Sequence, residues 1–346
     1  MEKVKIGVVG AGNISCNAHL PAYARTQLAS VEVICDLDLD RAKQAAERFG
    51  IPRVCSSVTE MIKEGGIEAV DVCTWNNAHS DVAVEAAHAG LHVMCEKPLA
   101  LNLSEALRIE KAVKETGVKF MLAVPNRFRP ENRRARAMRD AGDLGEVYFA
   151  RAAYVRRRGT PLGWFTDLAH AGGGPVIDIG VHCIDAAWYI MGNPRPVSVL
   201  ASTSYRIGDY KTLGVDRWHG TPCPDNQFNV EDSGAGCIRF ENGAIMLFEA
   251  AWAINLPPRS EITVCGSKAG LTLDPLTVYG EKDGYLNDET LTTEGETNAI
   301  FNEIEAFCKY VRSETDSPVP ISQAVTLQRM LQGIYDSAAA GREVLI

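Results

Sequence analysis

Two residues one helical turn apart, Asp178 and His182, carry the clearest chemical signal in this 346-residue chain. A carboxylate and an imidazole at positions i and i+4 of a helix lie on the same face. A neutral imidazole accepts a proton near pH 7, and a neighbouring carboxylate orients the ring and stabilises its protonated form. The pair therefore predicts acid–base chemistry, with an ordinary contact on a helix surface as the alternative.

A third polar residue, Asp185, falls on the same stripe when the helix is drawn at about 100° per residue. An apolar stripe lies a quarter turn away, so the polar stripe should face an interface or a cleft. Either carboxylate is within reach of His182, and the helical angles alone do not choose between them. The glycines at 172–174, just before this helix, predict close approach of the backbone to a ligand.

A glycine-rich turn near the N-terminus, residues 10–15, predicts a nucleotide site because it follows an apolar strand and opens a helix. Gly10 permits the tight turn, Gly12 lets the backbone approach a pyrophosphate, and the helix N-terminus supplies unpaired N–H groups. Ser15 stands where a third glycine is usual and is small enough for close packing. The residues expected to bind the cofactor here are Gly10, Gly12, Asn13 and Ile14.

Asp36 ends the second expected strand, where a carboxylate binds the ribose hydroxyls of adenosine about 20 residues beyond the glycine turn. A carboxylate repels the 2′-phosphate of NADP, and Leu37 offers no guanidinium to receive it. The sequence therefore predicts NAD in preference to NADP. Arg41 is the residue that points the other way.

The first part of the chain alternates short apolar runs with segments of helical period, which predicts an α/β fold. Strands are expected at 4–9, 31–35, 69–74, 92–95 and 119–124, with helices such as 40–49, 79–89 and 104–116 between them. Strands that are apolar throughout belong to a parallel sheet covered on both faces, in a doubly wound Rossmann arrangement. We expect this nucleotide-binding domain to span residues 1–127.

The second part, residues 128–346, is expected to form an α+β domain that binds the substrate. Strand-like runs follow one another without intervening helices, which predicts an open, mostly antiparallel sheet. Asn242-Gly243 is a hairpin signal, and a long helix is expected over 298–313. The expected strands are 146–157, 197–205, 234–240, 244–253 and 262–265.

Composition narrows the class of partner to a small polar molecule. A net charge of −9 argues against nucleic acid or an anionic membrane as the main partner. No signal peptide and no apolar stretch of about 18 residues are present, so we expect a cytoplasmic protein. The ten cysteines are dispersed and should be reduced. His219 and Cys223 lack further paired ligands nearby, so no metal site is expected.

Lys97, in Glu96-Lys97-Pro98, follows the fourth of these apolar runs, at the sheet edge where open α/β folds bind ligands. Together with the glycine turn and residues 172–185, this segment resembles the Gfo/Idh/MocA oxidoreductase family over essentially the full length of the chain. Further segments that carry the resemblance are Thr74–His79, Asn126–Phe128, Glu231–Asp232 and Ser337–Val344.

The resemblance implies an NAD(P)-dependent dehydrogenase that oxidises one secondary hydroxyl of a sugar, sugar derivative or cyclitol such as inositol. It implies that Lys97 contacts the substrate hydroxyl and the nicotinamide ribose, that His182 is the acid–base residue, and that Asp178 is its partner. It also implies assembly through the open sheet, as a homodimer or homotetramer.

The same resemblance implies further contacts with the cofactor, which we expect from Thr74, Trp75, Asn76, His79, Glu96 and Arg127. Trp75 stands where the family commonly has proline, and it could stack on the cofactor or belong to the core. Arg127 could lie near the nicotinamide or take part in a surface ion pair. The loop at 156–165 precedes the glycine run at 172–174. From this loop, Arg156 and Trp164 are expected to bind substrate. The alternative role of Trp164 is a hydrophobic anchor for the loop.

Two other functions fit parts of this pattern. An NAD-dependent glycosidase of the same fold oxidises C3 transiently and recycles its cofactor, so that net NADH formation separates it from a dehydrogenase. A non-catalytic sensor would keep the fold, but the presence of Lys97, Asp178 and His182 together argues against it.

Overall fold

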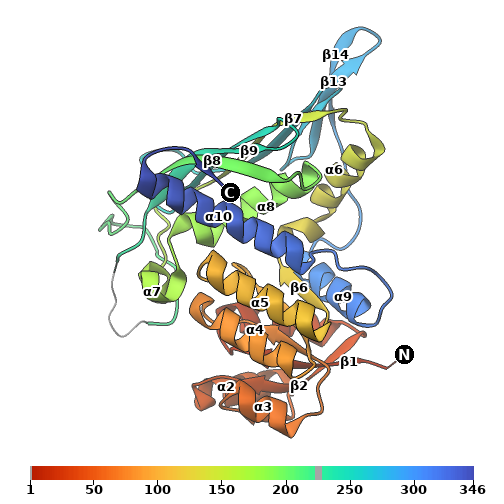
Figure 1. The fold of residues 1–346 in the computed structure, drawn as a ribbon, viewed down its shortest axis with the longest axis vertical. Coiled ribbons are helices and arrows are strands. Elements are labelled where there is room, and N and C mark those ends of the chain that lie inside the picture. The colour runs from red at the N-terminus through yellow and green to blue at the C-terminus, as the bar shows by residue number, and fades with distance from the viewer. Residues whose placement is uncertain (1, 223–227) are drawn as a thin grey trace. The chain divides into compact units, whose positions relative to one another are not determined.

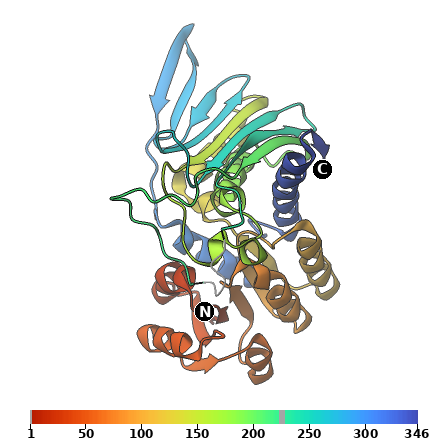
Figure 2. The same ribbon diagram turned by 90° about the vertical axis from the view of Figure 1, so that its left-hand side faces the viewer.

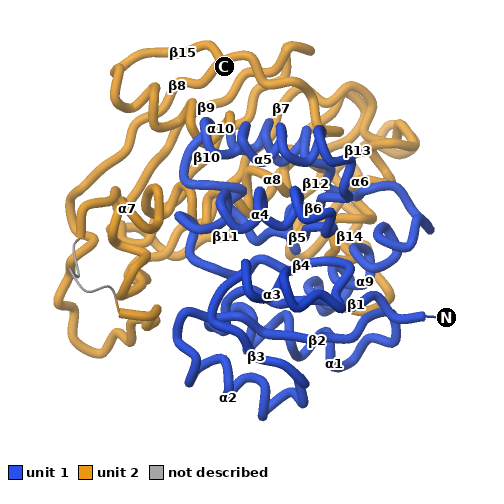
Figure 3. Tube along the Cα trace, turned by 60° about the horizontal axis from the view of Figure 1, so that its bottom comes forward, with its two compact units in different colours: residues 1–125, 298–328 blue, residues 126–297, 329–346 orange. Residues whose placement is uncertain are grey.

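The computed structural model describes residues 2–222 and 228–346, which divide into two compact units (Figure 3). Unit 1 consists of residues 1–125 and 298–328, and unit 2 of residues 126–297 and 329–346. Cys223, considered above as a metal ligand, lies outside the described residues.

Unit 1 contains a six-stranded sheet in the order β3-β2-β1-β4-β5-β6, with every neighbouring pair parallel. This is the strand order of a Rossmann fold, and it confirms the predicted doubly wound sheet. One strand, β3, was not anticipated because a three-residue run is too short to show a pattern. The strands are β1 Val4–Val9, β2 Ala29–Cys35, β3 Arg53–Cys55, β4 Ala69–Val72, β5 His92–Glu96 and β6 Phe120–Ala123.

Four helices of unit 1 that are labelled in Figure 1, α2, α3, α5 and α9, follow a residue whose side chain accepts a backbone N–H of the first turn. In α5, for example, the side chain of Asn102 accepts the N–H of Glu105, and Gly117 ends the helix in a left-handed conformation. The helical segments are η1 Ser15–His19, α1 Leu20–Arg25, α2 Leu39–Phe49, α3 Val58–Glu64, η2 Asn76–Ala78, α4 His79–His88, α5 Leu103–Thr116 and α9 Ala299–Val311.

Helix α9 returns to unit 1 from far along the chain, so the units differ from a single division after residue 127. Its apolar face, with Ile304, Phe307 and Cys308 buried, packs against η1 and α1. Lys119 ties down its C-terminus, since the ammonium donates to the carbonyl oxygens of Tyr310 (2.7 Å) and Val311 (2.8 Å). Sequence order alone does not reveal where such a face packs.

Unit 2 contains a nine-stranded sheet in the order β14-β13-β12-β11-β7-β10-β9-β8-β15, in which only β7 and β10 pair in parallel (Figure 2). The predicted mostly antiparallel sheet is therefore confirmed, including the turn at Gly243, where φ is +85°. The strands are β7 Val147–Val155, β8 Pro196–Ser204, β9 Ser233–Phe240, β10 Ile245–Ala251, β11 Arg259–Gly266, β12 Gly270–Thr272, β13 Thr277–Lys282, β14 Tyr285–Thr290 and β15 Val344–Leu345.

A helical segment formed by η5 (Val176–Gly180) and α8 (Val181–Ile190) packs against this sheet, with η5 on β10 and α8 on β7 and β11. The remaining helical segments are η3 Pro125–Phe128, α6 Pro130–Ala141, η4 Trp164–Thr166, α7 Leu168–Ala171 and α10 Ile321–Ala340. Within residues 2–222 and 228–346, we find no helix whose length and apolar character would let it cross a membrane.

Candidate active site

The glycine turn after β1 accepts only glycine at its first position. Gly10 has φ +103°, and a Cβ there would stand 2.5 Å from the carbonyl oxygen of Cys73. Its N–H donates to the carbonyl of Cys35 at 2.7 Å, which ties the turn to β2. At Gly12, by contrast, no described atom lies within 4 Å of the position a Cβ would take. The turn therefore leaves room for a pyrophosphate at Gly12.

The helix that opens after this turn presents its first residues outward. Asn13 and Ile14 are exposed, whereas Ser15 is buried and its hydroxyl donates to the carbonyl of Gly12 at 3.0 Å. Ser15 thus fits the close packing expected of a third glycine and also braces the turn. The exposed Asn13 and Ile14 flank the space next to Gly12.

Asp36 follows β2 and is joined directly to the glycine turn. One carboxylate oxygen accepts the N–H of Ala11 at 2.7 Å, and the other accepts the N–H of Asp38 at 2.9 Å. The guanidinium of Arg41 lies 3.3 Å from the Asp36 carboxylate and 3.7 Å from that of Asp38. Arg41 is therefore already matched by two carboxylates, and a 2′-phosphate would meet negative charge here.

We expect Asp36→Ser to lower the preference for NAD over NADP about tenfold, which corresponds to about 1.4 kcal/mol. The substitution removes both the acceptor for the ribose hydroxyls and the charge that repels a 2′-phosphate. The measurement is kcat/KM with each cofactor. Asp40→Ser, which changes an exposed carboxylate on α2, serves as the control. An unchanged cofactor preference in Asp36→Ser would remove Asp36 from the site.

The segment after β4 holds Thr74 and Trp75, both half-buried, and Asn76 and His79, both buried. The His79 ring lies with Nδ1 2.8 Å from the carbonyl oxygen of Pro98 and Nε2 3.2 Å from that of Thr74. Burial lowers the pKa of His79, which keeps the ring neutral near pH 7. His79 therefore joins the loop after β4 to the loop after β5, and none of its surface is exposed.

Lys97, which follows β5, is half-buried, while the preceding Glu96 is buried. Glu96 in turn lies against His19, and His19 lies against Asp71, both of which the sequence analysis missed. A signal for them exists, since Asp71 is a carboxylate inside the otherwise apolar strand β4. A charged residue in a buried strand almost always has a partner.

In unit 2, the segment formed by η5 and α8 is buried almost all round, but it leaves Asp178 and His182 partly exposed. Within residues 176–190, Tyr189 is the other residue that is not buried. The indole N–H of Trp252, a fully buried residue, donates to Asp178 at 2.9 Å. The amide of Asn126 donates to the backbone carbonyl of His182 at 3.3 Å. The proposed acid–base pair is thus held on a rigid, packed element.

The turn that carries Asp178 is π-helical, because η5 spans Val176–Gly180 before the regular helix α8 begins. A π-turn has i→i+5 hydrogen bonds, so the angle of about 100° per residue does not hold across Asp178. Single π-turns inside α-helices occur frequently at functional sites.

Asp185, the rival partner for His182, forms a buried ion pair with Arg127. The guanidinium meets the carboxylate through Nε at 2.9 Å and Nη2 at 2.6 Å, and the two residues are 3% and 0% exposed. The guanidinium also lies 5.3 Å from the ring centre of Tyr189. Arg127 is thus an interior ion-pair member, and Asp178 becomes the stronger candidate partner of His182.

The glycines before this helix make room for groups of the chain itself. A Cβ at Gly174 would stand 2.0 Å from the carbonyl oxygen of Glu231, and one at Gly173 would stand 2.1 Å from the Tyr335 hydroxyl. The buried Glu231 carboxylate accepts the N–H groups of Gly174 (2.8 Å) and Val176 (3.2 Å) and the Tyr335 hydroxyl (2.9 Å). Glu231 therefore caps the helix, a pairing that its distance in sequence concealed.

The loop residues expected to bind substrate differ in their surroundings. Trp164 is 8% exposed and packs on Phe165 with ring centres 4.0 Å apart, as a hydrophobic anchor would. Arg156 is half-buried against Tyr154, and its guanidinium donates to the carbonyl of Gly159 at 3.3 Å. Together with Arg157 and Arg158, Arg156 lines an open hollow of about 530 Å³. The packing therefore favours the anchor role for Trp164 and places Arg156 in the lining of this hollow.

Comparison with known proteins agrees with this arrangement over the whole chain. Residues 4–124 match the family described as "Oxidoreductase family, NAD-binding Rossmann fold", and residues 132–272 match the "GFO/IDH/MocA C-terminal domain". D-glucoside 3-dehydrogenase of Escherichia coli is 32% identical over 99% of this chain and 97% of that protein.

Levoglucosan dehydrogenase of Pseudarthrobacter phenanthrenivorans is 32% identical over 72% of this chain and 68% of that protein. A solved structure of levoglucosan dehydrogenase in complex with NADH superposes with a TM-score of 0.87 at 26% identity, covering 100% of this chain and 99% of the other. The sheet order, the glycine turn and these matches agree, and the chain belongs to the Gfo/Idh/MocA family of oxidoreductases, with an NAD-binding Rossmann domain at its N-terminus.

Proposed function

We propose that this protein is an NAD-dependent dehydrogenase that oxidises one secondary hydroxyl on the ring of a sugar or glycoside to a ketone. The observation that carries the proposal is the pair Asp178 and His182, which stay partly exposed on a helical segment that is otherwise almost entirely buried. A buried, packed helix holds such groups in one geometry, as acid–base catalysis requires.

The chemistry assigns one task to each group. The hydroxyl carbon loses a hydride to the nicotinamide of NAD, and the hydroxyl proton passes to the imidazole of His182. Asp178, fixed by Trp252, stabilises the imidazolium that forms. Lys97 binds the substrate hydroxyl and favours the negative charge that develops on its oxygen. Ketone, NADH and one proton are the products.

The substrate class is narrowed by the relatives, whose names are those of a D-glucoside 3-dehydrogenase and a levoglucosan dehydrogenase. A glucoside and levoglucosan, an anhydro sugar, both have a blocked anomeric carbon. We therefore place glycosides and anhydro sugars ahead of free aldoses and inositols, and the C3 hydroxyl ahead of the others.

The test is NADH formation, followed by absorbance, with panels of glycosides, anhydro sugars, aldoses and inositols. Turnover with members of the first two panels supports the proposal, and no turnover with any of the four panels contradicts it. A glycosidase that recycles its cofactor would instead release the aglycone without accumulating NADH. Parallel measurement of aglycone and NADH therefore distinguishes the two activities.

We also propose that two or more copies associate through the outer face of the nine-stranded sheet. Leu200, Cys237 and Leu247 stand opposite one another on β8, β9 and β10, so they project from the same face. Leu200 is 50% and Leu247 37% exposed. Exposed apolar rows of this kind mark interaction surfaces.

Light scattering coupled to gel filtration should accordingly give the mass of a dimer or tetramer. Leu200→Arg combined with Leu247→Arg is expected to shift the protein to the 37.6 kDa monomer, because two charges would be buried in the interface. A monomeric mass for the unmodified protein would refute this mode of association.

A further inference from the structure

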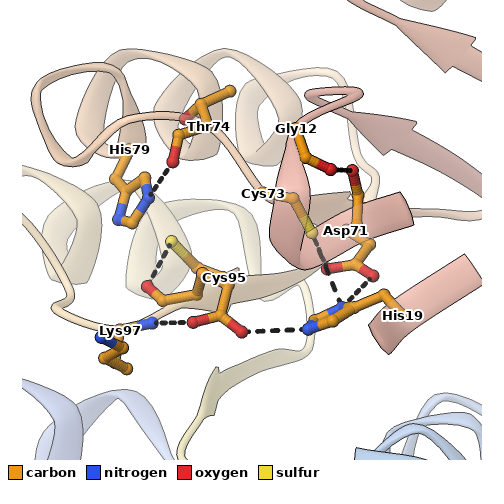
Figure 4. Close-up of polar contacts among 10 residues, drawn as sticks. Gly12, His19, Asp71, Cys73, Thr74, His79, Cys95 and Lys97 are labelled. Carbon is orange, nitrogen blue, oxygen red and sulfur yellow. Dashed lines mark hydrogen bonds and ion pairs between the residues drawn. The ribbon is translucent and has the colours of Figure 1, made fainter. Parts of the chain in front are cut away.

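A chain of buried charged groups lies behind Lys97 in unit 1 (Figure 4). His19 of η1 lies between two carboxylates, with Nδ1 2.8 Å from Asp71 in β4 and Nε2 2.9 Å from Glu96 at the end of β5. The second oxygen of Glu96 accepts the backbone N–H of Lys97 at 3.0 Å. Four contiguous groups thus connect the first helix and two neighbouring strands to the lysine that we assign to substrate binding.

His19 carries a proton on both nitrogens in this arrangement. A neutral imidazole has one N–H, so one of its two contacts would set a nitrogen lone pair against a carboxylate. Burial works to lower the pKa of His19, but the Asp71 carboxylate outweighs it and holds that pKa well above 6.5. Burial works to raise the pKa of Glu96, but His19 and Lys97 bring it below its ordinary value. The group is therefore an imidazolium between two carboxylates.

His19, Asp71 and Cys73 also offer ligand atoms within 4.8 Å of one another. A metal ion bound there would have to displace the proton between His19 and Asp71. The short contacts of the two ring nitrogens with Asp71 and Glu96 favour the ion chain.

Three further titratable groups lie near this chain of residues: Tyr23 on α1, Cys73 after β4 and Glu303 on α9. Burial raises the pKa of each, which favours its neutral form. The charges that remain are those of His19 and Lys97, set against Asp71 and Glu96. Loss of His19 would leave the two buried carboxylates with Lys97 as the remaining cation. A dry interior strongly disfavours such an excess of negative charge.

We propose that His19 is a positioning residue that acts through Glu96 on Lys97. By keeping Glu96 fixed and ionised, it holds a carboxylate oxygen on the Lys97 N–H and so fixes the point from which the lysine side chain extends. The inference rests on the proposed function, in which Lys97 binds the substrate hydroxyl. If His19 served only the fold, its loss would lower the stability of the protein without changing the contribution of Lys97 to the rate of hydride transfer.

A double-mutant cycle between His19 and Lys97 tests this, with His19→Asn as the uncharged variant. Single-turnover hydride transfer at saturating NAD gives rates even for slow variants. We expect His19→Asn to slow hydride transfer about tenfold when Lys97 is present and less than about twofold in Lys97→Ala, because residues in one network are coupled. The fall in thermal unfolding temperature should be at least as large in Lys97→Ala, where no cation remains beside the two buried carboxylates.

Tyr23→Phe is the matched control, since its buried hydroxyl has no hydrogen-bond partner within the described residues and it should leave the rate unchanged. Equal rate losses in both backgrounds, or no loss in either, would overturn the inference. Should His19→Asn fail to fold, Asp71→Asn replaces it in the same cycle, with the same pattern expected. The proposed function is tested separately, since full turnover in Lys97→Ala alone would refute the role of Lys97 without any His19 variant.

Discussion

Replacing His182 with alanine should lower kcat by about 10²- to 10⁴-fold, the range that positioned acid–base residues contribute. Lys97→Ala should lower kcat within the same range, since it removes the cation that favours charge on the substrate oxygen. Steady-state NADH formation with a glycoside substrate gives kcat, and calorimetry gives the Kd for NAD. We expect that Kd to stay within about threefold of the unmodified value, because both variants keep the glycine turn and Asp36, and Lys97→Ala loses only its expected contact with the nicotinamide ribose.

His170→Ala is the matched control for His182→Ala. His170, on the short helix α7 of unit 2, pairs with Asp167 and lies outside the segment of η5 and α8. Its loss should leave kcat nearly unchanged. Asp178→Asn should give a smaller loss than His182→Ala, because the amide still accepts from Trp252 but carries no charge. Unchanged kcat in His182→Ala would remove this residue from the mechanism.

Arg127→Met should lower the free energy of unfolding by about 3–5 kcal/mol, the cost of breaking a buried ion pair by removing one partner. Asp185 has no exposed surface, so the substitution leaves a carboxylate in the interior without its cation. Urea unfolding followed by fluorescence measures the loss. This is the largest change in stability that the structure leads us to expect from one substitution in the candidate site.

The double variant Arg127→Met with Asp185→Leu is the control, because an apolar pair of similar volume leaves no charge behind. It should recover most of the lost stability. The Kd for NAD separates this role from the contact near the nicotinamide that the sequence implies. If Arg127→Met weakens NAD binding and leaves stability unchanged, the ion pair is not the main role of Arg127.

The fold was largely predictable because its signals are local. Apolar strands separated by helical segments led to the parallel sheet, and Asn242-Gly243 marked the hairpin. Strands β13 and β14 were not predicted, since most of their residues are exposed and show no alternation of apolar and polar positions. The return of α9 to unit 1 was also missed, because packing against η1 and α1 leaves no trace in neighbouring sequence.

The candidate site was predictable where its residues are close in sequence and hidden where they are not. Asp178 and His182 stand out by their spacing alone. The partners Arg127 and Asp185 are 58 residues apart, and each has a plausible local explanation when viewed alone. The π-turn of η5 adds a second limit, because the angle of about 100° per residue does not hold between Asp178 and His182.

The cap formed by Glu231 shows the same limit. The glycines at 172–174 were expected to let a ligand approach the backbone closely. The periodicity of the sequence does not show which part of the chain could take the place of that ligand. In the structure, Tyr335 and Glu231, which come from much later in the chain, pack against Gly173 and Gly174. The contacts of Glu231 with this segment fix the start of the helix that carries Asp178.

A stoichiometric assay with NAD and a glucoside, in which NADH, keto sugar and free aglycone are measured together, tests the dehydrogenase activity itself. We expect one NADH for each keto sugar formed, no release of aglycone, and loss of both products in His182→Ala. Aglycone release without net NADH, or NADH formation that survives in His182→Ala, would contradict it.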